Sequence, residues 1–264
     1  NPAYIKVWFI HRERDSLTAQ EAIVKAAGDA AHAAGKKLAV HATELVVAKA
    51  AMRAGADFLV HSVFDQPVDD EFIALARARN VVYCPTLFVT MGYPLALSNL
   101  WRATPEELVR ADPQILAAMD DLNEIPREKL PERFAALLKD AKPPAPPAIA
   151  MQNLRKVLDA GITVVMGTDA GNIGTLHGPS ILREMRLMQD SGLTPLEVLR
   201  ASSTNGAQVL GLVGKTGLIA PGMLADLVLL DADPLADTGN VGKVYRVIKN
   251  GVVHEPEKLI EAIR

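Results

Sequence analysis

Short, almost continuously apolar runs separated by helical segments constrain the fold of this chain more than any other feature. The runs cover residues 4–10, 38–41, 58–61, 81–87 and 162–167. The segments between them have apolar residues at helical spacing and cover residues 18–34, 44–54, 69–79 and a stretch that ends at residue 160. Strands that are apolar on both faces are typical of a parallel sheet covered by helices. The sequence therefore predicts an α/β fold.

The spacing of the runs favours a closed barrel of the (β/α)₈, or TIM, type. Such a barrel has about 250 residues in eight units, which is roughly 31 residues per unit. Lys6 and His41 are 35 residues apart, and His41 and His61 are 20 apart. His61 and Asp169 are 108 residues apart. Two units account for about 60 of these, so roughly 45 residues are surplus.

The surplus is assigned to an insertion at residues 92–147. This segment holds Trp101, several short amphipathic pieces and a proline-rich run at residues 142–147. A long insertion on this face of a barrel is typical of a lid or a substrate-shaping element. The alternative is a surface excursion tied down by a semi-rigid proline spacer.

The C-terminal part of the chain changes character. Residues 179–190 and 195–210 are predicted to form two helices. Beyond them, a strand is expected at 227–231, and residues 244–253 carry Asn250-Gly251 between apolar runs. Asn-Gly in that setting is a hairpin signal. The expected division is a barrel portion at residues 1–212, followed by a small β-sandwich subdomain segment and tail at residues 213–264.

Composition narrows the classes of function. A net charge of −3 gives no electrostatic footprint for nucleic acid. No apolar stretch reaches the roughly 18 residues of a membrane span. Neither nucleic acid nor a membrane is therefore an expected partner, while a homo-oligomer is possible and the compartment stays open. The single Cys84 excludes an internal disulfide and is expected to be a buried thiol.

Polar residues at the ends of the apolar runs predict a metal centre. His41, His61 and Asp169 each follow such a run, and Lys6 lies within the first one. Residues at the carboxyl ends of barrel strands converge on one pocket. Imidazole and carboxylate are standard ligands of zinc and similar ions, although a lone strand-end histidine is more often structural. A bound ion lowers the pKa of water, and Asp169 would serve as general acid/base.

Lys6 has two alternative interpretations. A buried ammonium is costly, so a strand lysine neutralises, pairs or faces solvent at a sheet edge. If Lys6 points into the barrel, a depressed pKa makes it nucleophilic toward carbon dioxide. The resulting carbamate, a carboxylated lysine, is an anionic ligand able to bridge two metals. Edge exposure is the competing interpretation.

Two further histidines are candidates for substrate contact. His177 follows Asp169 by eight residues, on a loop before a helix, where it either faces the mouth of the site or pins that helix. His11 lies just beyond the strand of Lys6. His32 and His254 are assigned to structure.

These residues resemble those of the amidohydrolase superfamily, nearest to the imidazolonepropionase-like hydrolases and Xaa-Pro dipeptidases. The motifs are Ile5-Lys6-Val7-Trp8, Val40-His41-Ala42, Val60-His61-Ser62, Pro85-Thr86, Gly167-Thr168-Asp169-Ala170-Gly171, Gly217-Leu218, Pro221-Gly222 and the run from Ala225 to Asp231. The resemblance implies that Lys6 is the carboxylated bridging lysine of the fourth strand. It makes His41 and His61 the ligands of the second metal on strands five and six. It makes Asp169 the first metal's ligand on strand eight and the general acid/base, and places His177 near the substrate.

One departure from the family pattern is large. The family has a His-x-His pair on the first barrel strand, and these 264 residues contain none. Only strands four to eight are recognisable, so the expectation is a partial barrel from the C-terminal part of a longer hydrolase. Five strands of eight leave two open sheet edges, which favour association.

The expected function is metal-dependent hydrolysis of C–N bonds in amides, cyclic amides or dipeptide-like small molecules. One or two divalent ions are expected; zinc is the first choice, and manganese, cobalt and iron tolerate the same ligands. A first rival is a mononuclear deaminase of a heterocycle, with Lys6 structural and Glu44 as an extra acid/base. A second is a catalytically incompetent fragment that acts as a binding module.

Overall fold

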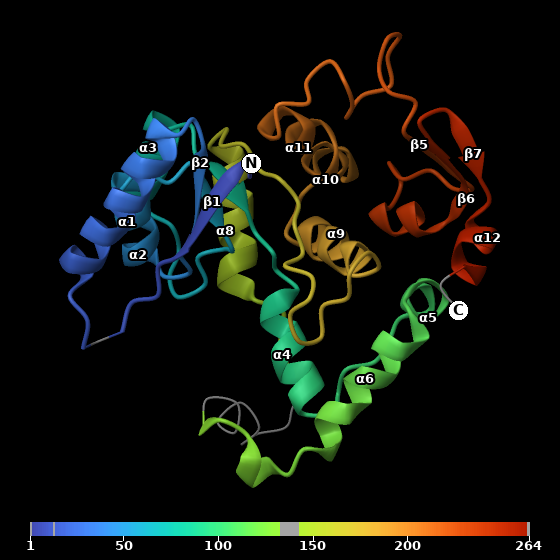
Figure 1. The fold of residues 1–264 in the computed structure, drawn as a ribbon, viewed down its shortest axis with the longest axis horizontal. Coiled ribbons are helices and arrows are strands. Elements are labelled where there is room, and N and C mark those ends of the chain that lie inside the picture. The colour runs from blue at the N-terminus through green and yellow to red at the C-terminus, as the bar shows by residue number, and fades with distance from the viewer. Residues whose placement is uncertain (1, 13, 133–142, 263–264) are drawn as a thin grey trace.

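The computed structural model describes residues 2–12, 14–132 and 143–262 (Figure 1). Its first sheet contains four parallel strands in sequence order, β1 (Tyr4–Trp8), β2 (Lys37–His41), β3 (Phe58–Val60) and β4 (Val82–Cys84). Trp8 pairs with His41, His41 with Val60, and Val60 with Cys84. The carboxyl ends of all four strands therefore lie at one edge of the sheet, as the alternating sequence pattern predicts.

Helices α1 (Leu17–Ala33), α2 (Leu45–Arg53) and α3 (Asp70–Ala78) lie together on one side of this sheet (Figure 1). The side chains of Ser16 and Asp69 cap α1 and α3 by accepting backbone N–H groups of Ala19 and Phe72. Such caps satisfy donors that a helix leaves unpaired. Helices α8 (Ala148–Asp159) and α9 (Ile181–Asp190) also contribute to the main core. The largest fully buried apolar side chains include Leu38, Met52, Leu59, Phe72, Leu87 and Leu154.

The strand predicted at residues 162–167 is shorter than expected. Only Val164 forms a ladder bridge, parallel to Tyr83 of β4. Val165 N donates to Tyr83 O at 3.0 Å, but the next amide, Met166 N, donates to Ala201 O at 3.0 Å. The segment thus leaves the sheet for a neighbouring helix after one pairing. The described residues form five parallel segments and do not close a barrel, and within them no strand pairs with the outer edge of β1.

The insertion is helical where the structure describes it. It contains α4 (Val89–Leu97), α5 (Pro105–Arg110), α6 (Pro113–Glu124) and a 3₁₀ turn, η1 (Arg127–Lys129). Figure 1 shows α4 leading away from the parallel sheet into the arm formed by α5 and α6. Helix α4 begins three residues before the predicted boundary at 92. Residues 133–142 of the predicted insertion lie outside the described part of the chain.

The expected helix at residues 195–210 is two helices, α10 (Pro195–Ser202) and α11 (Thr204–Val209). The backbone of Ser203, with φ −135° and ψ −81°, is not helical and separates them. The antiparallel C-terminal sheet is confirmed, with β5 (Leu227–Leu230), β6 (Val244–Lys249) and β7 (Val252–His254). Asn250 and Gly251 both have positive φ, as the predicted hairpin turn between β6 and β7 requires.

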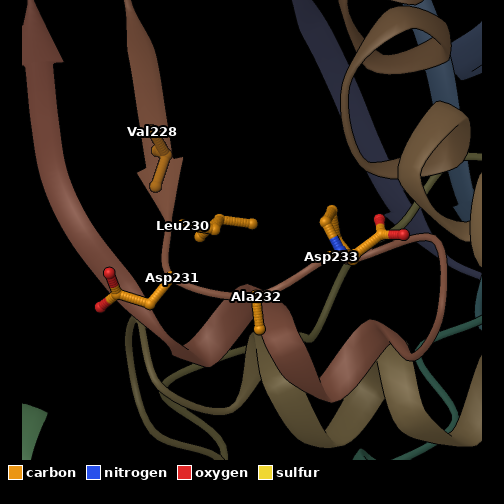
Figure 2. Close-up of a pocket in the computed structure, with 6 residues that line it drawn as sticks. Val228, Leu230, Asp231, Ala232 and Asp233 are labelled. Atoms are coloured by element: carbon orange, nitrogen blue, oxygen red, sulfur yellow. The ribbon is translucent and has the colours of Figure 1, made fainter.

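The C-terminal region also contains η2 (Thr238–Gly242) and α12 (Pro256–Glu261). In Figure 1, helices α9 to α11 lie between the parallel sheet and this second sheet. A shallow hollow follows β5, but Figure 2 shows the carboxylates of Asp231 and Asp233 pointing away from each other there. Two divergent carboxylates do not build a ligand site. Among the described residues, no helix has the length and apolarity needed to cross a membrane.

Candidate metal centre

A cavity of about 290 Å³ opens at the carboxyl ends of the parallel strands. Four residues that the sequence analysis singled out line it: Lys6, His41, His61 and Asp169. Lys6 and His41 come from β1 and β2, while His61 follows β3 and Asp169 follows the segment that pairs with β4. Because parallel strands end at a common edge, residues far apart in sequence lie around one cavity.

The two imidazoles and the carboxylate lie close together without being hydrogen-bonded to one another. The rings of His41 and His61 have centroids 4.6 Å apart, and their planes are inclined by 70°. Nε2 of His61 lies 3.8 Å from Oδ2 of Asp169. This separation exceeds a hydrogen bond. Within the described residues, no three His, Cys, Asp or Glu side chains already meet the geometry of a cation site.

The chemistry of this donor set fits a divalent metal ion. Burial, followed by electrostatic interaction with His41 and Lys6, lowers the pKa of His61 to about 3. Burial and then Lys6 also lower the pKa of His41, against the opposing effect of Asp169. Both rings are therefore neutral at pH 7, and a neutral imidazole nitrogen is the form that binds metals.

Thr86 orients His61 and was not among the predicted residues. Its Oγ1 lies 2.6 Å from Nδ1 of His61, and both residues are buried. The tautomer that donates from Nδ1 to Thr86 leaves the Nε2 lone pair facing Asp169. A second partner that fixes ring orientation in this way is typical of metal-binding histidines.

The backbone around the cavity adopts an uncommon conformation at three positions. His61, Thr86 and Asp169 have φ values of 79°, 45° and 54°. Asparagine, aspartate and histidine tolerate this region better than most residues, whereas β-branched Thr86 is a genuine outlier there. Unfavourable backbone conformations concentrate at functional sites, where surrounding structure compensates for the strain. The strained backbone of Thr86, which is bonded to His61, therefore marks this side of the cavity.

Lys6 combines features of both interpretations weighed from the sequence. It belongs to the edge strand β1 and is exposed, as the competing interpretation expects. It also lines the cavity, and its charge contributes to the low pKa values of both histidines. The ammonium is thus available to the site without the penalty of burial.

Asp169 is held by the loop that follows it. Asn172 Nδ2 donates to Asp169 Oδ2 at 2.7 Å and to the Asp169 carbonyl at 3.1 Å. Asn172 also lines the cavity, as do Tyr93, Thr90 and Val89 of α4. Sequence reasoning assigned no role to these residues, because their proximity depends on how α4 packs against the loop.

The two histidines predicted to contact substrate do not line the cavity. His177 is exposed, and its ring packs against Gly171, where a Cβ would lie 3.0 Å from Nε2. His11 is half-buried, and its Nδ1 lies 3.1 Å from Oε1 of Gln20. Glu44 occupies the N-cap position of α2 and also lies outside the cavity lining.

Cys84 is half-buried and has a pKa raised to about 12, first by burial. A Cβ added to Gly167 would lie 2.6 Å from its sulfur. The thiol is therefore a packing group against Gly167, although the residue is half-buried where the sequence predicted a buried thiol.

Curated proteins similar to this chain include an imidazolonepropionase and a deaminase. The chain is 36% identical to imidazolonepropionase of Chloroflexus aggregans over 104 residues, which cover 38% of this chain and 24% of that protein. It is 41% identical to 5-methylthioadenosine/S-adenosylhomocysteine deaminase of Pyrococcus furiosus over 88 residues, 30% of this chain and 20% of that protein. These matches span about a quarter or less of the curated relatives' length.

Solved structures share the fold over a larger part of the chain. A Xaa-Pro dipeptidase with bound methionine in the active site is 24% identical, with a TM-score of 0.64, over 89% of this chain and 48% of that one. A putative prolidase from Bifidobacterium longum is 22% identical, with a TM-score of 0.66, over 99% of this chain and 59% of that one. The chain thus spans about half the length of these structures. The model of the amidohydrolase family matches residues 11–253, and this chain belongs to that family.

Proposed function

We propose that this chain is part of a metal-dependent hydrolase of C–N bonds in amides, cyclic amides or dipeptide-like small molecules. The observation that carries the proposal is the grouping of Lys6, two neutral histidines and Asp169 around one cavity. Membership of the amidohydrolase family supports it. So do the names of similar proteins, which include an imidazolonepropionase and a Xaa-Pro dipeptidase.

The proposed architecture is the part of a (β/α)₈ barrel that runs from its fourth to its eighth strand. Strands β1 to β4 and residues 162–167 would be those five strands, residues 92–147 an insertion, and residues 213–264 a segment of a β-sandwich subdomain. The parallel order of the five segments and the likeness to the solved structures support this assignment.

Lys6, His41, His61 and Asp169 would hold one or two divalent ions, zinc first among them. When bound, such an ion lowers the pKa of a water molecule and polarises a carbonyl oxygen. Lys6, once carboxylated, would add an anionic ligand. Asp169 would accept a proton from water with its carboxylate and pass it to the leaving nitrogen. Its side chain is 28% exposed, so solvent protons and substrate both reach it.

The remaining walls of the cavity would contact the substrate. Trp8 and Phe64 supply aromatic surface, and Thr90 and Tyr93 of α4 supply hydroxyl groups. The insertion therefore fits a substrate-shaping element better than a passive surface excursion. Contacts from His177 and His11, which lie outside the lining, would require a substrate that extends beyond the cavity.

The test compares wild-type protein with Asp169→Asn, and exposed Asp190→Asn on α9 serves as the matched control. The substrates are Xaa-Pro dipeptides and cyclic amides, and the sample is loaded with zinc. We expect kcat to fall by about 10²- to 10⁴-fold in Asp169→Asn, the usual contribution of a general acid/base. The circular dichroism spectrum should not change. Near-normal turnover by Asp169→Asn would refute the mechanism.

A heterocycle deaminase is a second candidate, because the Pyrococcus furiosus relative is a deaminase. Metal analysis of Lys6→Ala separates the two. Loss of one metal equivalent per chain supports the two-metal hydrolase, whereas an unchanged content and ammonia release from aminated heterocycles support the deaminase. Absence of both metal and turnover would favour a non-catalytic binding module.

A further inference from the structure

Helix α4 of the insertion is in direct contact with the loop that follows Asp169. A Cβ added to Gly174 would lie 2.5 Å from the carbonyl oxygen of Gly92, and one added to Gly92 would lie 2.7 Å from that of Ile173. Nothing larger than glycine fits at either position without movement of the backbone. The indole Nε1 of Trp101 also donates to Gly174 O at 2.9 Å. These contacts fix the distance between α4 and the loop.

A short chain of hydrogen bonds crosses this contact and ends on the catalytic candidate. The Tyr93 hydroxyl, on α4, donates to Oδ1 of Asn172. Nδ2 of Asn172 donates to Oδ2 of Asp169 at 2.7 Å. The same Oδ2 faces Nε2 of His61 at 3.8 Å. Because a carboxylate oxygen has two lone-pair directions, Asn172 occupies one and leaves the other turned toward His61.

We propose that Tyr93 and Asn172 form a positioning pair, through which the insertion helix orients the Asp169 carboxylate toward His61. The proposal rests on the proposed function, since it assigns Asp169 to the metal centre. An asparagine amide has an acceptor end and a donor end, and only the donor end stabilises a carboxylate. The Tyr93 hydroxyl holds the acceptor end, so Nδ2 must face Asp169.

Loss of Tyr93's hydroxyl would remove the bond at Oδ1 of Asn172, so only the two bonds from Nδ2 to Asp169 would still hold the amide. Tyr93 would therefore act on Asp169 through Asn172. Because Tyr93 also lines the cavity, a substrate in contact with its hydroxyl would change the orientation of Asp169. The insertion thus has a specific role: it sets the orientation of one proposed metal ligand.

The test is a titration of the full chain with Co²⁺, monitored by visible absorption. It compares wild type with Tyr93→Phe, Asn172→Ala and the double variant. Tyr245→Phe, at an exposed tyrosine of strand β6, is the matched control. We expect Asn172→Ala to bind Co²⁺ about 10- to 100-fold more weakly and to change its visible band, as loss of a ligand's supporting partner does. Tyr93→Phe should weaken Co²⁺ binding by about 2- to 10-fold, which corresponds to the loss of one hydrogen bond.

The double variant distinguishes a chain from two independent effects. If Tyr93 acts only through Asn172, the double variant binds Co²⁺ as Asn172→Ala does. Additive losses, or single variants that match wild type and Tyr245→Phe, would overturn the proposal.

Crystal structures of wild type and Asn172→Ala provide a readout that needs no metal. We expect Asp169 to change rotamer or to adopt two conformers in the variant; an unchanged rotamer would overturn the proposal. Wild-type protein that binds no Co²⁺ would refute the proposed metal centre while the Asp169 rotamer still decides the positioning pair. Normal hydrolysis with an unmoved Asp169 would retain the function and refute the pair.

Discussion

Two buried carboxylates of this molecule differ from the carboxylate at the cavity in what their oxygens contact. The anchor carboxylates, Glu107 and Glu184, are buried at 1% and 0% exposure. Glu107 accepts from Arg183 at both oxygens, at 2.7 and 2.6 Å. Glu184 accepts the backbone N–H groups of Leu87 and Phe88 at 2.7 and 2.8 Å. Asp169 instead faces His61 across 3.8 Å, at the rim of a cavity.

The difference separates stabilising groups from groups available for binding. The two anchor carboxylates have every oxygen bonded within the protein, so they fasten α5 and the start of α4 to α9. Around the cavity, His61 and Asp169 are close but unbonded to each other, and the backbone is strained at β-branched Thr86. This backbone conformation is costly to maintain, and the two polar side chains lie close together without a hydrogen bond between them. Such an arrangement fits a site that receives a further ligand.

The largest effect is expected from breaking an anchor. Arg183→Ala leaves the Glu107 carboxylate buried without its partner, which typically costs about 3–5 kcal/mol in free energy of unfolding. The same change removes the stacking of the guanidinium on Phe88, at 4.9 Å from the ring centre. Urea denaturation measures the difference.

The matched control is Arg186→Ala on the same helix, where the side chain is 56% exposed and its ion pairs are worth about 0–1 kcal/mol. Equal losses of stability in the two variants would break the comparison. Zinc affinity should stay at the wild-type value in both, since neither residue lines the cavity.

The second anchor predicts a dependence of stability on pH. Burial raises the pKa of Glu184 from 4.5 to about 7, so between these values the folded protein retains a proton that the unfolded chain has lost. Stability from this group is complete below pH 4.5 and is lost as the pH rises to 7. The loss is on the order of 3 kcal/mol at 1.36 kcal/mol per pKa unit.

Glu184→Gln should lack this dependence, whereas Glu257→Gln on exposed α12 should retain it. Free energies of unfolding measured in urea from pH 4.5 to 8 give the comparison. A wild-type curve that stays parallel to that of Glu184→Gln would show that Glu184 is already ionised when folded, held by its two N–H donors.

The smallest effect on stability, and the largest on the cavity, is expected from Thr86→Val. Valine keeps the shape and the β-branch at φ 45° and removes only the hydroxyl that meets His61 Nδ1. An unpaired buried polar group costs about 1–3 kcal/mol. Zinc affinity should fall by about 10- to 100-fold, because the ring of His61 loses its orienting partner.

Isothermal titration with zinc measures this loss, and Thr86→Ser, which retains a hydroxyl, should bind like wild type. If valine and serine bind zinc equally well, Thr86 is merely a packing residue and the cavity loses its main distinction from the anchors.

The sequence predicted the parallel order and the meeting of His41, His61 and Asp169, because strand period and strand direction are local properties. It also predicted the hairpin at Asn250-Gly251, a turn specified by its own two residues. It placed a strand at residues 162–167 and a single helix at 195–210, and the structure differs at both. In the first, an amide of Met166 bonds to Ala201, and no local pattern records so distant a partner.

What the sequence by itself determined is which residues are apolar and where each strand ends, and therefore which polar side chains share one edge of the sheet. Only the tertiary structure decided how those side chains are held. Thr86 against His61, Asn172 against Asp169 and Tyr93 against Asn172 join segments up to 79 residues apart. Their residue types carry no signal, since a hydroxyl or an amide serves as well in solvent. Packing of α4 on the Asp169 loop brings Tyr93 within reach of Asn172, and pairing of β3 with β4 brings Thr86 to His61; both depend on contacts distant in sequence.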